Sequence, residues 1–205
     1  MKKTVIIDYG MGNLRSVYKA LLKVGFKDVE VTNSKDRVNK ADIIVLPGVG
    51  AFKDAMKNLR NLSLIDPIIK GIKEGKPFMG ICLGMQLLFE RSYEFGVEEG
   101  FSIFRGEVKL LPASVKIPHM GWNQVWIRKK DGIFKGIRGG SYFYFVHSYR
   151  VVPEDEDIVA STTDYGEYFV SAIEKENIWA VQFHPEKSQK LGLKVLGNFR
   201  EFACG

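Results

Sequence analysis

The chain has 205 residues, 45% of them hydrophobic and 26% charged, which suits one compact soluble domain spanning residues 1–205. The net charge of +6 is spread over basic residues that often neighbour acids, and the tightest basic cluster, residues 128–130, runs into Asp131, so we expect no nucleic-acid partner. No apolar run suits a membrane span or a signal peptide, and two cysteines exclude a disulfide framework, so we expect a cytoplasmic protein.

The first half of the chain alternates short apolar runs with amphipathic segments. Strands are predicted at residues 4–8, 29–32, 43–46 and 78–81. Helices are predicted near residues 52–60 and 65–74, and around the inward-facing Leu14, Val17, Leu21 and Val24. This order predicts an α/β fold of the flavodoxin-like kind, with a mostly parallel central sheet and helices on both faces.

The second half of the chain is rich in strands. They are predicted at residues 106–111, 122–128, 142–146, 158–163, 168–174 and 178–183, before a last helix with Leu191, Val195 and Phe199. Some of these strands should pair antiparallel at the edge of the sheet. Between residues 142 and 147, tyrosines alternate with phenylalanines, so one aromatic row can serve the core while the other faces outward or is buried as well.

A cysteine stands where one apolar strand turns into a helix. Cys82 is flanked two positions away by Gly80 and Gly84, the sequence form of a nucleophile elbow. Glycines let neighbouring main chain pass close to such a strained turn, and a helix start favours thiolate over thiol. By itself the pattern also fits an inert buried cysteine.

The third histidine, His184, ends another apolar run, and Pro185 separates it from Glu186. Proline pushes the residue before it into an extended conformation, so the histidine and the glutamate can project to one side. A carboxylate there fixes the ring tautomer and supports the imidazolium that forms when the ring takes a proton. The alternative is a strand-end histidine bonded to a loop. Because strand ends share one edge of an open α/β sheet, His184 and Cys82 can meet there.

A third strand runs into the turn formed by Gly48, Val49 and Gly50. Its amides, together with the N–H of Leu83, can form an oxyanion hole for acyl transfer. A phosphate cradle is disfavoured because no Gly-Lys-Ser/Thr follows, and a plain structural turn is the remaining alternative.

These motifs carry a family resemblance. Residues 80–86 with residues 183–186 resemble the class I (triad) glutamine amidotransferases. Residues 8–13, 46–50 and 118–123 (Pro-His-Met-Gly-Trp-Asn) are similar, more narrowly, to the glutaminase subunits of imidazole glycerol phosphate synthases in histidine biosynthesis.

The resemblance implies roles for individual residues. It implies Cys82 as nucleophile, His184 as general base then acid, and Glu186 as its orienting partner. The residues implied to hold L-glutamine are Gln86, Glu94, His147, Ser148 and Tyr149. Those implied to face a partner are Gly10, Asn13, His119, Met120, Trp122, Asn123 and Tyr144. No metal and no cofactor are expected.

The expected activity is hydrolysis of L-glutamine through a thioester, with ammonia passed to a (β/α)₈-barrel cyclase subunit in a heterodimer. The cyclase would make imidazole glycerol phosphate and an aminoimidazole carboxamide ribonucleotide. Three alternatives stay open at this point. They are an amidotransferase subunit of another pathway, a cysteine hydrolase of the same fold acting on peptides or γ-glutamyl bonds, and a noncatalytic flavodoxin-like module that binds a partner through its aromatic face.

Overall fold

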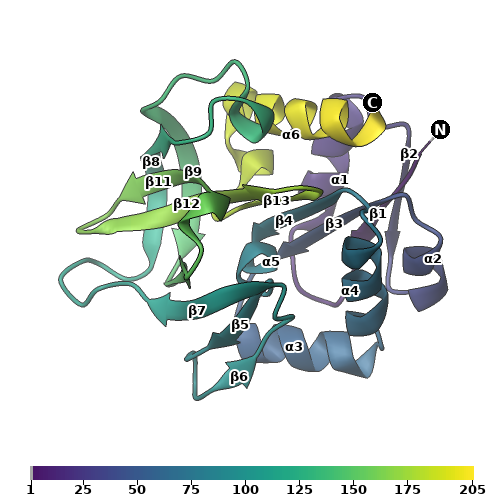
Figure 1. The fold of residues 1–205 in the computed structure, drawn as a ribbon, viewed down its shortest axis with the longest axis horizontal. Helices are drawn as coiled ribbons and strands as arrows, with labels where there is room; N and C mark the ends of the chain where they lie inside the picture. Colours follow the sequence, from purple (N-terminus) through teal and green to yellow (C-terminus); the bar gives the residue numbers. More distant parts are fainter. Residues whose placement is uncertain (1) are drawn as a thin grey trace.

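The computed structural model describes residues 2–205 and shows a large twisted sheet with helices on both sides (Figure 1). Its parallel part is formed by β2 (Asp28–Thr32), β1 (Lys3–Ile7), β3 (Ile43–Gly48), β4 (Phe78–Cys82) and β13 (Ile178–Val181), in that spatial order. The carboxyl ends of these strands therefore lie along one edge of the sheet. The register pairs Gly48 directly with Cys82.

The sheet continues with antiparallel strands, as the strand-rich second half predicts. These are β12 (Tyr168–Lys175), β11 (Val159–Asp164), β8 (His119–Ile127) and β9 (Ser141–His147). Along β9, Phe143, Phe145 and His147 are buried while Tyr142 is 53% exposed, so the two aromatic rows face opposite sides. Only the phenylalanine row belongs to the core.

Helices cover both faces of the parallel strands, because neighbouring strand residues alternate between two cores. Val5, Ile7 and Ile44 pack toward one side, and Ile6, Ile43 and Val45 toward the other. The first core lies under α2 (Lys35–Asn39), α3 (Phe52–Asn61) and α4 (Ile65–Lys73); the second lies under α1 (Leu14–Lys23) and α6 (Gln189–Cys204). No helix within residues 2–205 is long and apolar enough to cross a membrane.

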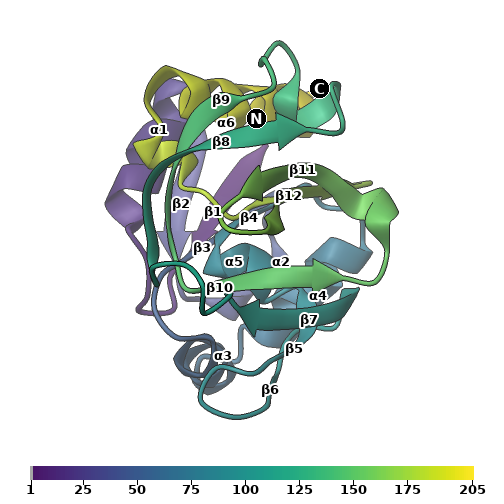
Figure 2. The same cartoon turned by 90° about the vertical axis from the view of Figure 1, so that its left-hand side faces the viewer.

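A second sheet was not expected from the sequence. Among the described residues it contains four strands in the order β10 (Tyr149–Pro153), β7 (Phe104–Leu110), β5 (Phe89–Ser92) and β6 (Glu98–Glu99). Figure 2 shows β10 and β7 lying side by side, apart from the end of the large sheet that carries β8 and β9. Strands β9 and β10 are consecutive in the chain, so the backbone passes from one sheet to the other at Ser148.

The helix after Cys82 is shorter than the sequence suggests. Residues 87–89 extend the apolar run, but α5 spans only Leu83–Gln86. The carbonyl of Leu87 accepts from Phe101 N at 2.8 Å, and that of Leu88 from Ile103 N at 2.9 Å. Pairing with the second sheet therefore replaces further helical turns. Three short 3₁₀ turns complete the described chain: η1 (Gly132–Phe134), η2 (Glu156–Ile158) and η3 (Pro185–Lys187).

The close crossing of β3 over α5 predicts a strict requirement for glycine at position 84. A Cβ there would lie 1.8 Å from the carbonyl oxygen of Leu46. The clashing atom belongs to the backbone, which cannot move aside as the end of a flexible side chain can. We therefore expect Gly84→Ala to lower the free energy of unfolding by about 3 kcal/mol in urea titrations.

The matched control is Gly197→Ala in α6, where a Cβ meets nothing within 4 Å. That variant should raise the free energy of unfolding by about 0.5–1 kcal/mol, since alanine is the better helix former. Equal stability of the Gly84→Ala variant and the parent chain would contradict the tight crossing.

Candidate active site

Cys82 occupies a strained turn at the end of β4. Its backbone has φ 55° and ψ −108°, a region that L-residues rarely adopt. Glycines allow the turn to form: a Cβ at Gly80 would lie 2.8 Å from the carbonyl oxygen of Gly84. The thiol is 5% exposed and lines the cavity described below, so the sharp turn presents sulfur to a cavity rather than to the core.

His184 and Glu186 form a buried pair. The Nδ1 atom of His184 lies 2.8 Å from Oε1 of Glu186, and their side chains are 2% and 1% exposed. The histidine backbone is fixed by a 2.9 Å bond from its N–H to Tyr144 O and a 2.7 Å bond from Ser188 Oγ to its carbonyl. The carboxylate of Glu186 accepts a hydrogen bond from Nδ1–H of His184. This leaves Nε2 as the ring nitrogen that can exchange a proton.

Electrostatics connect this histidine to Cys82. Burial alone lowers the pKa of His184, but charge interaction and hydrogen bonding with Cys82, and then with Glu186, outweigh burial and raise the pKa above its usual range. Among the described residues, Nε2 of His184 has no hydrogen-bond partner of ordinary geometry. The ring nevertheless interacts with the sulfur of Cys82, and it can carry the proton that the thiol loses.

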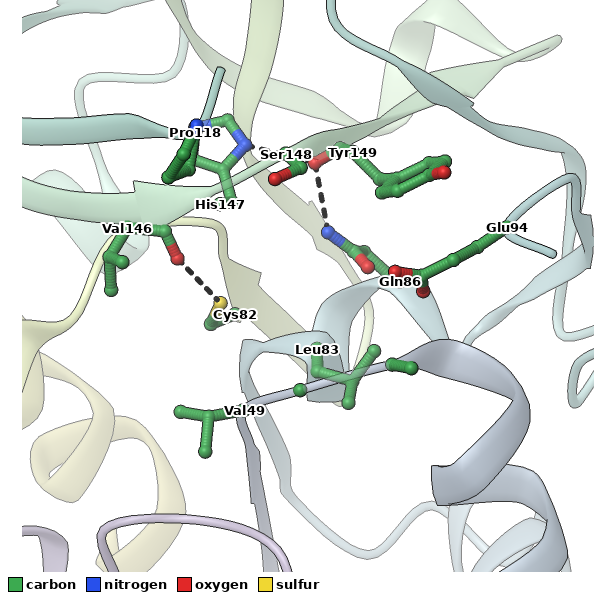
Figure 3. A pocket seen from close by; sticks show the side chains of 12 residues that line it. Val49, Cys82, Leu83, Gln86, Glu94, Pro118, Val146, His147, Ser148 and Tyr149 are labelled. Atoms are coloured by element: carbon green, nitrogen blue, oxygen red, sulfur yellow. Dashed lines mark hydrogen bonds between the residues drawn. The ribbon is translucent and has the colours of Figure 1, made fainter.

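The turn predicted as part of the oxyanion hole lies beside the sulfur. Gly48 pairs with Cys82 across the two strand ends, and Val49 and Gly50 line the same cavity as Leu83. Gly50 has φ 96°, a conformation that favours glycine. Figure 3 shows Val49 and Leu83 on the same side of Cys82. The four residues predicted for the oxyanion hole therefore lie together.

The cavity at the carboxyl edge has a volume of about 360 Å³, within the usual range for a small-molecule site. Lining it are Val49, Gly50, Ala51, Cys82, Leu83, Gln86, Glu94, Pro118, Val146, His147, Ser148 and Tyr149. Figure 3 shows residues 146–149 opposite Cys82 and Leu83. All five residues predicted to hold glutamine are in this lining, and they come from both sheets.

Two of them form one end of the cavity. The Gln86 amide nitrogen donates to Tyr149 O at 3.0 Å, so its oxygen is left toward Glu94, as Figure 3 shows. Glu94 accepts from Phe52 N at 2.7 Å, and burial raises the pKa of Glu94 despite that bond. Two oxygen acceptors side by side suit an ammonium group such as the α-amino group of an amino acid.

His119 is not where the sequence prediction placed it. It was expected at a partner-facing surface, but it is 3% exposed and its Nδ1 lies 2.9 Å from Nε2 of His147. Asn123 Nδ2 lies 3.2 Å from its other nitrogen. His119 also stacks on Tyr165, with ring centroids 4.0 Å apart. His119 is therefore an internal residue. Its ring can be buried because both ring nitrogens, its only polar atoms, are hydrogen-bonded.

Of the other residues predicted to face a partner, four are exposed, and Asn123 and Tyr144 are half-buried. Met120 and Trp122 are 62% and 46% exposed on the outer face of β8, and Tyr144 packs against Trp122 at 6.0 Å between ring centroids. Gly10 and Asn13 are exposed in the segment that follows β1, where Asn13 also caps α1.

Two functional candidates were missed at the sequence level. Gln182 is fully buried and its Nε2 donates to Cys82 Sγ at 3.5 Å. Tyr9 is 1% exposed, and its hydroxyl, which has no partner among the described residues, packs against Gly48. Burial, then the nearby charge of Cys82, raises the pKa of Tyr9. Gln182 is one polar residue in an apolar run and Tyr9 is a single tyrosine between Asp8 and Gly10, so no local pattern points to either. No cluster of three His, Cys, Asp or Glu side chains suited to a metal occurs in residues 2–205.

Comparison with known proteins places this geometry in a family. Residues 5–201 match the model of the family described as glutamine amidotransferase class-I. The chain belongs to the class-I glutamine amidotransferases. It is 62% identical over 201 residues to the imidazole glycerol phosphate synthase subunit HisH of Aquifex aeolicus, covering 98% of this chain and 97% of the relative. It is 54% identical to the HisH subunit of Pyrococcus furiosus, with 98% and 99% covered. At these identities over full length, this amidotransferase falls among the HisH subunits.

Solved structures show the same fold at lower identity. A crystal structure of a glutamine amidotransferase superposes with a TM-score of 0.76 at 18% identity, covering 98% of this amidotransferase and 99% of that chain. The structure of PurLQS from Thermotoga maritima gives 0.72 at 22%, with the same coverage. The predicted α/β fold with a parallel central sheet and antiparallel edge is confirmed.

The burial of His119 predicts a pH-dependent stability. Burial lowers the pKa of His119 to about 4, while the unfolded chain titrates near 6.5. Below pH 6.5 the unfolded chain binds a proton at His119, whereas the folded protein does not until the pH approaches 4. The free energy of unfolding therefore decreases as the pH falls from 6.5 toward 4. Between pH 7.5 and 5, chemical denaturation should show the parent losing on the order of 1 kcal/mol more than His119→Asn. Parallel pH curves for the two proteins would refute a neutral buried His119.

Proposed function

We propose that this amidotransferase is the glutaminase subunit of imidazole glycerol phosphate synthase and hydrolyses L-glutamine to glutamate and ammonia. The observation that carries the proposal is the buried His184–Glu186 pair that interacts with Cys82, the cysteine of the cavity lining, in a chain 62% identical to a HisH subunit. Relatives at lower identity share the fold only, so the high-identity relatives point to the pathway and the geometry of the site points to the chemistry.

The first half-reaction forms a thioester. The Cys82 sulfur attacks the side-chain amide carbon of glutamine, and the carbonyl oxygen becomes an oxyanion facing Leu83 N–H and the turn at residues 48–50. His184, charged through the Nε2 proton taken from the thiol, gives that proton to the leaving nitrogen. Glu186 supports the positive ring throughout. Collapse of the tetrahedral intermediate breaks the C–N bond and releases ammonia.

The second half-reaction releases glutamate. Neutral His184 accepts a proton from water, the resulting hydroxide attacks the thioester carbon, and the same oxyanion hole receives the charge. The C–S bond breaks, and the thiolate regains its ion pair with the ring. One glutamine and one water are consumed for each glutamate and ammonia. The raised pKa of His184 suits this cycle because the ring carries a proton in the resting ion pair and in both tetrahedral intermediates, and is neutral only at the thioester.

Ammonia released into neutral water becomes ammonium, which has no lone pair for attack, so a shielded route to an acceptor is required. We propose a heterodimer with a (β/α)₈-barrel cyclase that docks on the exposed face of β8 around Met120 and Trp122. An aromatic, largely uncharged patch of this kind is typical of a docking surface. A nucleophilic thiol also needs a reducing compartment, which supports a cytoplasmic location.

An amidotransferase subunit of another pathway is the nearest alternative, and its partner would be a different synthase. The HisH relatives cover nearly the whole length of this chain, which favours the histidine pathway. A noncatalytic module is disfavoured because His184 and Glu186 are buried beside a strained cysteine, an arrangement that costs stability without a catalytic use.

Cys82→Ser should abolish glutamine hydrolysis, because a serine hydroxyl is not ionised by the same histidine. We expect a loss of at least about 10³-fold in glutamate release, measured with the cyclase bound. The matched control is Cys204→Ser, since Cys204 lies in the last helix away from the cavity. Appreciable turnover by the Cys82→Ser variant would overturn the nucleophile assignment.

Glutamine hydrolysed without an acceptor is wasted, so the turn at residues 48–50 is proposed to present its donor fully only with liganded partner. Glycines at positions 48 and 50 let a peptide reorient at low cost. Adding the cyclase and its nucleotide substrate should accelerate glutamate release about tenfold or more. Equal rates with and without nucleotide would contradict this control, while hydrolysis itself would still support the glutaminase.

A further inference from the structure

A buried amide holds the nucleophilic sulfur. Gln182 directly follows β13, is fully buried, and its backbone N–H donates to Ser171 O at 2.9 Å. Its side-chain nitrogen donates to Cys82 Sγ at 3.5 Å, and its side-chain oxygen accepts from Gln86 Nε2 at 3.1 Å. A flipped amide would turn oxygen toward the sulfur and nitrogen toward a nitrogen. Both contacts therefore select one orientation.

Gln86 is oriented by the same contact. Its two N–H groups are both used, one on Gln182 Oε1 and one on Tyr149 O at 3.0 Å. This leaves only its oxygen for the cavity, on the side where Glu94 lies in Figure 3. The residue that holds the sulfur thus also fixes the acceptor that faces the substrate.

The chain of hydrogen bonds continues through two histidines, and each step determines the next. Tyr149 O can only accept, so His147 Nδ1, 2.9 Å away, carries the proton. In a neutral ring Nε2 of His147 is then an acceptor and takes the proton of His119 Nδ1 at 2.9 Å. His119 Nε2 in turn accepts from Asn123 Nδ2 at 3.2 Å. Burial keeps both rings neutral, with the pKa of His147 lowered to about 3.

The far end of this chain lies in β8. Asn123 is held by a second bond from Nδ2 to Asp164 O at 2.9 Å, and its oxygen accepts from Gln124 N at 2.7 Å. It is adjacent to Trp122, which is exposed on the outer face of the strand. One continuous path of hydrogen bonds therefore joins Asn123, the neighbour of the exposed Trp122 in β8, to the nucleophile.

We propose that Gln182 is a positioning residue for glutamine hydrolysis, and that it is the inner end of a hydrogen-bonded chain from Asn123 through His119, His147, the Tyr149 carbonyl and Gln86 to the Cys82 sulfur. The proposal rests on the glutaminase function proposed above. A largely buried hydrogen-bonded network is rigid because losing one bond leaves the neighbouring groups unpaired. Displacement of β8 is thereby transmitted to the sulfur and to the acceptor in the cavity.

The first test replaces Gln182 with methionine, which keeps the volume and removes both polar groups. With the cyclase and its nucleotide bound, we expect kcat to fall at least about tenfold, since a small misplacement of a reacting group is costly, and KM for glutamine to rise because Gln86 is released. Ser171→Ala is the matched control: it removes the buried bond between Ser161 and Ser171, 2.9 Å long, without touching the cavity. A parent-like kcat and KM in the Gln182→Met variant would overturn the proposal.

A readout independent of turnover separates positioning from general stability. The rate at which iodoacetamide alkylates Cys82, followed by mass spectrometry across pH 5–9, reports the thiolate directly. Loss of the amide donor should shift this profile to higher pH in Gln182→Met and leave it unchanged in Ser171→Ala. An unshifted profile in Gln182→Met would contradict the contact with the sulfur. If the parent heterodimer releases no glutamate at all, the glutaminase function fails instead.

A double-mutant cycle tests whether the hydrogen-bonded path acts as one unit from Asn123 to Cys82. His119→Phe preserves the ring that stacks on Tyr165 and breaks the path between Asn123 and His147. If the path is one unit, the double variant with Gln182→Met should lose clearly less kcat/KM than the product of the two single losses, although the two side chains do not touch. Losses that multiply would show two independent residues and would refute the connected chain.

Discussion

The structure depends on one close approach of main chain at the carboxyl edge of the sheet. Strand β3 crosses so near the start of α5 that position 84 has no room for a Cβ beside the Leu46 carbonyl, and Gly80 meets the carbonyl of Gly84 in the same way. This packing holds Cys82 at φ 55°. The strain is sustained by the buried strands around it, and its result is a sulfur aimed at a cavity that the neighbouring strand end also lines.

The rest of the site is assembled around that sulfur by elements distant in sequence. Strand β13 ends next to β4 and delivers Gln182 and then His184, while the passage from β9 to β10 brings residues 147–149 over the opposite side. The second sheet closes the cavity with Glu94, which bonds the first N–H of α3. The parallel sheet thus supplies the reacting groups, and the strands beyond its edge supply the walls.

Charge in this site is balanced by pairing rather than by solvent. His184 is buried beside Cys82 and Glu186, and its interactions with these two groups raise its pKa against the effect of burial. His119 and His147 are buried without an anion beside them, so burial lowers their pKa values. His184 can therefore be charged while His119 and His147 stay neutral in the same region. The groups that surround each ring cause this difference in pKa.

Sequence alone determined the alternation of strands and helices, the elbow glycines at positions 80 and 84, and the pairing of His184 with Glu186, because each is written in local spacing. It did not reveal the second sheet, in which β5 and β6 are short and partly polar, nor the early end of α5, which is caused by hydrogen bonds from residues 101 and 103. Tertiary structure also decided that His119 is internal and that Gln182 touches the sulfur. Both depend on which strands become neighbours, and a strand's side-chain pattern specifies the face it buries but not the residue it will meet there.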